Sequence, residues 1–261
     1  MADKLLSIFV SHGAPSLVLE STPSRSFLSE LGASLGRPRA VLCVSAHWEA
    51  PRPSIGAARH PRMIYDFYGF PPELYAVQYP APGDPSLAQE VAKLLLEDGL
   101  DAVVDPSRGL DHGVWVPLSL MFPDANVPVV PLSVQPQLGA AHHFAIGRAL
   151  RPLRQENVLI LASGGATHNL RLLSTLDPGA PPPERTAAFQ AWLCESVGNA
   201  RVEDLLHYQE RAPYVPWNHP TQEHFLPLLV ALGAASDLAP GRVLNRRYEY
   251  GALSMAAFAW S

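Results

Sequence analysis

The stretch VLCVSAHWE, residues 41–49, begins as an apolar, β-branched run and ends in a histidine and a tryptophan. An apolar run of this kind, bounded by polar residues, predicts a strand that is buried on both faces of a sheet. A histidine costs free energy to bury unless its ring nitrogens find partners. His47, at the end of this strand, therefore indicates a polar site at that edge of the sheet.

Similar apolar runs alternate with amphipathic segments over most of the chain, the pattern of a mainly parallel sheet with helices on both faces. The runs that predict strands are 5–10, 40–45, 101–104, 127–133 and 158–162. Two helices have clear boundaries: Thr22 opens one that Gly36 closes, and Asp84 opens one that Gly99 closes. Further helices are predicted over 138–153, 184–198 and 221–232.

The last residues, 242–260, predict two strands around Gly251 that form an antiparallel edge or a hairpin. Together these elements predict an α/β fold in which residues 1–261 form a single domain. We expect three αβα layers, with a mainly parallel mixed sheet and helices on both of its faces.

Composition limits the partners and the location of the protein. A chain of 261 residues, 48% of them hydrophobic, is long enough for one large core. The formal net charge of −5 and the absence of a Lys/Arg run argue against a nucleic-acid partner. Two cysteines in apolar contexts favour a reducing compartment, and the apolar run near the N-terminus is too short for a signal peptide or a membrane span. We expect a cytoplasmic monomer or small homo-oligomer with no membrane partner.

Four histidines lie where a binding site is expected. His12 (FVSHGAPS), His47 (CVSAHWE) and His168 (LASGGATHN) each follow a predicted strand, and ligands bind beyond the carboxyl ends of the strands in open α/β sheets. His224 (HPTQEHFLPL) is expected in the first turn of a late helix that Thr221 caps. These four imidazoles are therefore expected to converge on one crevice.

His112, in GLDHGVWVPL, follows the third predicted strand and is expected near the same crevice. The two glycines of SGGATH permit a turn of positive φ and a close approach to a ligand. The remaining histidines that we assign to the surface are His60, His142, His143 and His207. Trp48 is either a wall of the pocket or part of the core, and Asp111 either caps a turn or contacts the substrate.

A cluster of neutral imidazoles favours a divalent transition metal such as iron or zinc over calcium or magnesium. The same histidines would suit a zinc hydrolase, in which the metal lowers the pKa of a bound water, or a metal-binding protein without turnover. Nucleophilic catalysis is the weaker interpretation, because the sequence has no G-x-S-x-G elbow.

Five motifs occur in the same order in the DODA-type (4,5-DOPA) extradiol dioxygenases, a branch of the class III extradiol ring-cleavage enzymes. They are SHGAPSL, SAHWE, GLDHGVWVPL, ASGGATHNL and HPTQEHFLPLLVALGAA. The sequence resembles this family from residue 5 to about residue 255. The resemblance implies one divalent metal ion per chain, Fe(II) for activity with Zn(II) also able to bind, and a DOPA-like catechol and O2 as substrates.

The resemblance also implies roles for individual residues. His12, His47 and His224 correspond to metal ligands, and His168 to the histidine that exchanges protons with the substrate. His112 corresponds to a second catalytic histidine, which contacts the substrate or the metal ligands. We take Trp48, Asp111 and His219, which stand in these motifs, as the candidate substrate-binding residues.

The wider class III group uses two histidines and one carboxylate as metal ligands, so Glu223 competes with His224 for the third position. The two residues are neighbours, and on a helix they point about 100° apart, so only one is expected to face the metal. We expect His224 to be the ligand and Glu223 to accept the free N–H of a ligand histidine.

Overall fold

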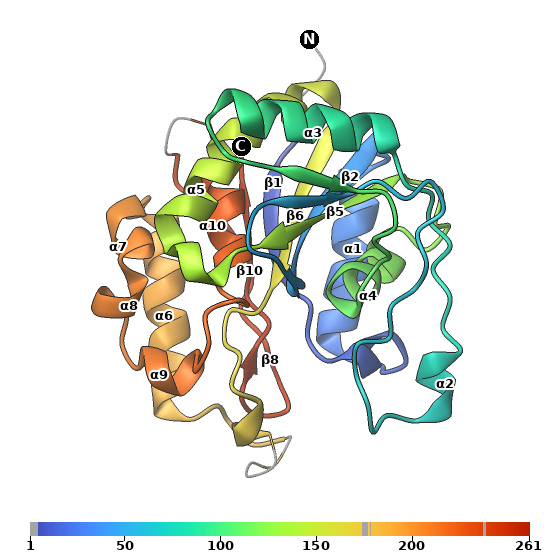
Figure 1. Cartoon of the computed structure of the whole chain (residues 1–261). Helices are drawn as coiled ribbons and strands as arrows, with labels where there is room; N and C mark the ends of the chain where they lie inside the picture. The colour runs from blue at the N-terminus through green and yellow to red at the C-terminus, as the bar shows by residue number, and fades with distance from the viewer. Residues whose placement is uncertain (1–4, 174–176, 178, 237–238) are drawn as a thin grey trace.

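The computed structural model describes residues 5–173, 177, 179–236 and 239–261, and a sheet of eight strands forms its centre (Figure 1). The strands lie in the order β4-β3-β5-β2-β6-β1-β10-β7. The four in the middle, β5, β2, β6 and β1, are parallel, while β10 and β7 are antiparallel additions at one edge and β3 pairs antiparallel with β5 at the other. A short hairpin of β8 and β9 lies outside this sheet.

The strands of the large sheet are β1 (Ser7–Ser11), β2 (Ala40–Glu49), β3 (Ser54–Gly56), β4 (Val103–Asp105), β5 (Val129–Val134), β6 (Val158–Gly164), β7 (Arg242–Asn245) and β10 (Ala257–Trp260). The hairpin strands are β8 (Tyr248–Glu249) and β9 (Leu253–Ser254). The longer helices are α1 (Pro23–Leu35), α3 (Pro85–Glu97), α4 (His112–Met121), α5 (Gly139–Leu150), α6 (Glu184–Gly198) and α10 (Leu226–Gly233). The short ones are α2 (Pro72–Tyr75), α7 (Val202–Leu206), α8 (Tyr208–Arg211) and α9 (Val215–Asn218). The 3-10 turns are η1 (Pro15–Val18), η2 (Pro136–Leu138), η3 (Arg151–Glu156) and η4 (Leu170–Leu172).

Helices cover both faces of the sheet because alternate side chains of its central strands are apolar on both faces. On one face, Ile8 and Val41 pack with α1 and α4. On the other, Phe9 and Leu42 belong to the clusters formed with α3, α5, α6 and α10. The three layers confirm the predicted architecture (Figure 1). Among the described residues, no helix combines the length and the apolar character of a membrane span.

Most of the predicted elements are present. Thr22 and Asp84 cap their helices as expected, since each side-chain oxygen accepts a hydrogen bond from a backbone N–H of the first turn. The predicted hairpin around Gly251 is β8–β9, and β10 inserts beside β1. The strand predicted over 40–45 is longer than expected. After Val44 the register of its pairing with β5 shifts, and β2 continues through His47 to Glu49.

The helix predicted over 221–232 begins later than expected. α10 starts at Leu226, and Thr221 does not cap it. The reason is Pro227, which has no N–H to donate and is best accommodated in the first turn of a helix. Glu223 and His224 therefore lie in the turn that precedes the helix.

Candidate metal centre

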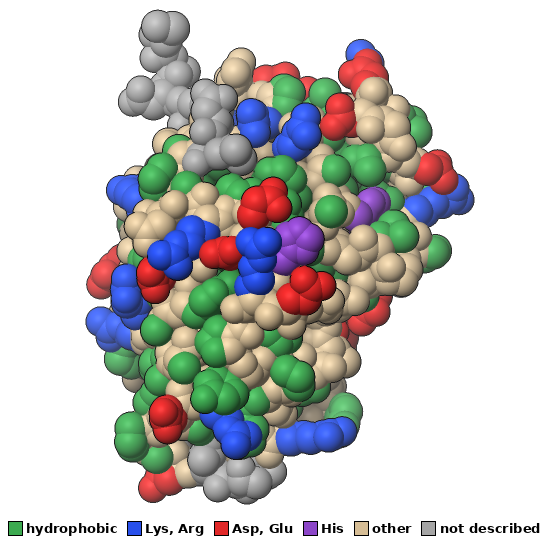
Figure 2. Space-filling view, turned by 90° about the vertical axis from the view of Figure 1, so that its left-hand side faces the viewer, with side chains coloured by type: hydrophobic (Ala, Val, Ile, Leu, Met, Phe, Trp, Pro, Cys, Tyr) green, Lys and Arg blue, Asp and Glu red, His purple; other side chains and the backbone are tan. Residues whose placement is uncertain are grey.

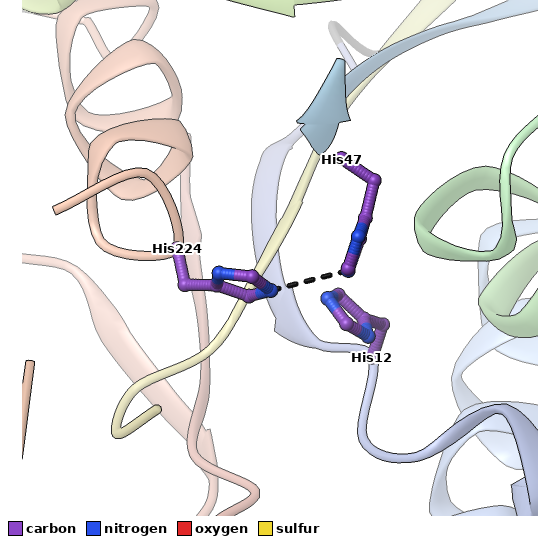
Figure 3. A group of neighbouring side chains, drawn as sticks. All are labelled: His12, His47 and His224. Carbon is purple, nitrogen blue, oxygen red and sulfur yellow. Dashed lines mark hydrogen bonds between the residues drawn. The ribbon is translucent and has the colours of Figure 1, made fainter. Parts of the chain in front are cut away.

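Three histidines from distant parts of the sequence point toward one another (Figure 3). His12 directly follows β1, His47 lies near the end of β2, and His224 lies in the turn before α10. Their ring centroids are 4.8–5.4 Å apart. The carboxyl ends of β1 and β2 and the start of α10 thus meet at the edge of the sheet where the sequence predicts a site.

Each of these rings is held through its Nδ1 atom. His12 Nδ1 donates to the carbonyl of Gly13 at 2.8 Å, and His224 Nδ1 donates to Glu223 Oε1 at 2.9 Å. His47 Nδ1 lies 3.3 Å from Asp66 Oδ2. A neutral imidazole has one N–H, so a proton fixed on Nδ1 leaves a lone pair on Nε2. All three histidines therefore present an Nε2 lone pair.

These lone pairs converge on a position that suits a cation. The Nε2 atoms of His47 and His224 are 3.1 Å apart, the contact dashed in Figure 3, and the buried His12 Nε2 has no hydrogen-bond partner among the described residues. Two nitrogens bound to one ion at about 2.0–2.1 Å lie about 2.9 Å apart at a right angle and about 3.4 Å apart at the tetrahedral angle. The residues present thus fit a single divalent metal ion.

Burial keeps these imidazoles neutral, the form that binds a metal. Loss of hydration, reinforced by the neighbouring imidazoles, lowers the pKa of His12 and of His224 well below the usual value. The same cause lowers the pKa of His47 to about 3. The protons that ordinarily compete with a metal for these nitrogens are therefore absent at neutral pH.

His168 and Glu223 form the side of the site nearest to α10. The His168 ring stacks on that of His224, with centroids 3.3 Å apart, and its Nδ1 lies 3.9 Å from Glu223 Oε1. Burial lowers the pKa of His168 to about 3. The Glu223 carboxylate also accepts from Thr221 Oγ1 at 2.9 Å. Glu223 is thus tied to the ligand candidate His224 through its side chain.

Asp66 forms the opposite side and was missed by the sequence analysis. Its Oδ1 accepts from the backbone N–H and from Nδ1 of His112, at 3.0 and 2.9 Å, and its Oδ2 faces His47. Partial burial would raise the pKa of Asp66, but these hydrogen bonds and the nearby histidines hold it at about 2. In the sequence, Asp66 stands out only as the one acidic residue of the aromatic stretch YDFYGF, residues 65–70.

Two glycines allow the elements of the site to approach one another. A Cβ on Gly164 would lie 2.2 Å from the carbonyl oxygen of His224, and Gly165 N–H donates to that oxygen at 2.9 Å. A Cβ on Gly113 would lie 2.7 Å from Ser45 Oγ and 3.0 Å from His47 Cδ2. Neither glycine of SGGATH has a positive φ, so that expectation was wrong: close contact with the His224 backbone requires Gly164.

A cavity of about 420 Å³ opens beside the histidines. His12, His47, His112 and His168 line its polar end. The rest of its wall comes mainly from the aromatic stretch 67–70, from the residues after His168, and from residues 253–255. The sequence-predicted catalytic pair, His112 and His168, thus lies at one cavity with two of the predicted metal ligands.

Three predicted substrate contacts lie outside the cavity lining. Asp111 is fully buried and accepts from Ser45 Oγ and Arg108 Nη2, both at 2.6 Å. Trp48 packs its ring against the Arg108 guanidinium, 4.7 Å from the ring centroid.

His219, the third of these predicted contacts, lies behind the turn after β6. Its Nε2 is 3.0 Å from the carbonyl oxygen of Ala166. These three residues support the ends of β2, β6 and α4.

His143 does not lie on the surface, contrary to the prediction. It is fully buried, its Nε2 accepts from the backbone N–H of Gln135 at 3.0 Å, and its Nδ1 donates to Gly139 at 2.7 Å. The reason is helical spacing, because His143 shares with Ile146 and Leu150 the face of α5 that packs on the sheet.

The comparisons with known proteins identify the class. The family model described as "Catalytic LigB subunit of aromatic ring-opening dioxygenase" matches residues 9–259, and the chain belongs to this family. It is an extradiol ring-cleavage dioxygenase, which confirms the resemblance seen in the five motifs. Dioxygenases of this family depend on a metal, and the histidine triad is able to bind one.

Several relatives are similar over nearly their full length. Proteins named 4,5-DOPA dioxygenase extradiol are 42% identical in Portulaca grandiflora (98% of this chain, 95% of the relative) and 40% identical in Beta vulgaris (98% and 96%). The protein of that name from Escherichia coli K12 is 38% identical (97% and 93%). A crystal structure of an uncharacterized protein from E. coli K12 superimposes with a TM-score of 0.77 at 32% identity, over 98% of this chain and 100% of that one.

The two candidates for the third ligand can be separated by conservative substitutions. His224→Gln should lose the metal, because it removes the nitrogen that faces His47 and His12. Glu223→Gln should retain it with affinity reduced about 10- to 100-fold, because it removes only the acceptor that orients His224. Metal titration of the apoprotein measures both affinities. Loss of binding in Glu223→Gln alone would make the carboxylate the ligand.

The contact between β6 and the His224 backbone predicts a second effect. Gly164→Ala should displace the turn that carries His224, lower the metal affinity, and cost about 1–3 kcal/mol of unfolding free energy through overpacking. Gly198→Ala is the matched control, since a Cβ there meets no atom of the described residues within 4 Å. Denaturant unfolding and metal titration check both variants. Unchanged metal affinity in Gly164→Ala would show that this contact does not position His224.

Proposed function

We propose that the chain opens the ring of a DOPA-like catechol beside its two hydroxyl groups, with O2 as the second substrate and Fe(II) as the active metal. The main support for this proposal is that three histidines, each fixed through Nδ1, direct Nε2 toward one point at the end of a cavity. Family membership supports the type of reaction. His12, His47 and His224 are the proposed ligands.

When bound, a divalent ion at this position polarises the oxygen atoms coordinated to it and keeps the two reactants together. His168 lines the cavity beside the ligands, where one of its ring nitrogens accepts the proton of a catechol hydroxyl and returns it during ring opening. Asp66 binds His112 Nδ1, which leaves Nε2 as the ring nitrogen for a hydrogen bond with the substrate. The product is a ring-opened semialdehyde acid.

An all-histidine donor set also suits zinc, and a zinc hydrolase is the rival function. The remaining expectations from the sequence stay proposals: a single catalytic domain over residues 1–261, a cytoplasmic monomer or small homo-oligomer, and no nucleic-acid or membrane partner. The family model, which matches residues 9–259, supports the single domain.

Metal exchange tests the proposed function. Apoprotein reconstituted anaerobically with Fe(II) should consume O2 when a catechol is added and form a ring-opened product, whereas the Zn(II) form should consume none. O2 uptake and the visible absorbance of the product are the measurements. Hydrolysis of an ester or amide by the Zn(II) form, with no O2 uptake by the Fe(II) form, would favour the rival.

The role of His168 predicts a separation of metal binding from turnover. His168→Ala should keep the metal and lower kcat about 10² to 10⁴-fold, the range typical of general acid and base catalysis. His207→Ala is the control, because His207 is exposed. Metal content and steady-state rates are measured on the same preparations. Loss of the metal in His168→Ala would make His168 a fourth ligand.

A further inference from the structure

Tyr68 stands at the mouth of the cavity. It is 93% exposed, and Leu170, which also lines the cavity, is 55% exposed. These two side chains therefore mark the end of the cavity that opens to solvent. The histidines line the polar end, so a catechol whose hydroxyl groups are bound there directs its ring substituent toward the mouth.

The segment that carries Tyr68 is fixed to the histidine cluster. Asp66 accepts hydrogen bonds from the backbone N–H and from Nδ1 of His112. The Phe67 ring packs edge-on to that of His112, with centroids 5.8 Å apart, and the Phe70 ring packs on Phe67 at 5.3 Å. The backbone of Tyr68 is thus held beside the catalytic histidines, while its own side chain is exposed to solvent.

The Tyr68 hydroxyl is the one hydroxyl of the described lining that has no hydrogen-bond partner among the described residues. The other lining hydroxyls donate their hydrogens within the protein: Ser11 Oγ to Ala256, Thr167 Oγ1 to Ala252 and Ser254 Oγ to Gln190. A carboxylate only accepts hydrogen bonds. Tyr68 is therefore the lining hydroxyl that can donate to a carboxylate without breaking an existing bond.

The described lining of the cavity contains no Lys or Arg. On the face of the molecule that carries α7 and α8, basic side chains lie among acidic ones (Figure 2), and Arg211 of α8 pairs with Asp204 of α7 at 2.6 Å. A carboxylate in the cavity therefore depends on a hydrogen-bond donor rather than on a cation. At the exposed mouth such a carboxylate keeps part of its hydration, which lowers the free-energy cost of binding a charged group.

We propose that Tyr68 is a specificity-determining residue, whose hydroxyl donates a hydrogen bond to the carboxylate on the side chain of a DOPA-like substrate. This inference rests on the proposed function. A hydrogen bond to a charged acceptor is stronger than one between neutral groups, but water competes for it at an exposed position. We therefore expect it to strengthen substrate binding about 3- to 10-fold and to leave the rate of ring opening unchanged.

The variant Tyr68→Phe removes the hydroxyl and keeps the ring. Four catechols separate the possible contacts: DOPA, 3-(3,4-dihydroxyphenyl)propionate with a carboxylate only, dopamine with an ammonium group only, and 4-methylcatechol with neither. In the Fe(II) enzyme, Tyr68→Phe should raise KM, and the Kd measured anaerobically, about 3- to 10-fold for the two carboxylates. The values for dopamine and 4-methylcatechol, and kcat for all four, should not change. Tyr75→Phe is the matched control, because Tyr75 is 37% exposed and lies outside the lining.

The pattern over the four compounds decides the outcome. An equal change for all of them, or no change for any, would overturn the inference. A change confined to DOPA and dopamine would make Tyr68 an acceptor for the ammonium group and would also overturn it. Absence of O2 uptake by the unaltered enzyme with all four compounds would instead overturn the proposed function, while the anaerobic Kd values would still test the role of Tyr68.

Discussion

Fixing the Nδ1 protons of His12, His47 and His224 is the interaction on which the site depends. Acceptors from three different segments hold these protons: the Gly13 carbonyl, Asp66 and Glu223. Without these acceptors, each ring could carry its proton on Nε2 and would then direct an N–H donor, not a lone pair, toward the centre of the site. With them, three lone pairs meet at one point, and only a cation satisfies all of them.

The sheet brings these rings together and the packing holds them there. Parallel β1, β2 and β6 end at the same edge, so side chains after each strand are neighbours although the sequence separates them. The turn before α10 joins them through the contact of Gly164 and Gly165 with the His224 carbonyl. Burial of this edge keeps the imidazoles neutral, and the aromatic stretch 67–70 completes the cavity beside them.

The architecture and the strand-end histidines could be predicted because they follow from simple periodicities and from parallel strand ends. α10 begins later than its apolar pattern predicts, because Pro227 restricts where the helix can start. Asp66 could not be found from its position, since it lies in an irregular segment between β3 and α2 and acts only through contacts with distant residues. The buried position of His143 follows from helical spacing and was predictable, whereas that of Asp111 depends on the distant residue Ser45 as well as on its near neighbour Arg108.

The proposed chemistry requires that one divalent ion is bound by three imidazole Nε2 atoms. Anomalous diffraction at the iron edge, from crystals of the protein loaded anaerobically with Fe(II), measures this directly. We expect a single peak within bonding distance, about 2.0–2.2 Å, of Nε2 of His12, His47 and His224. A peak bonded to Glu223, or one between Asp66 and His112, would contradict it.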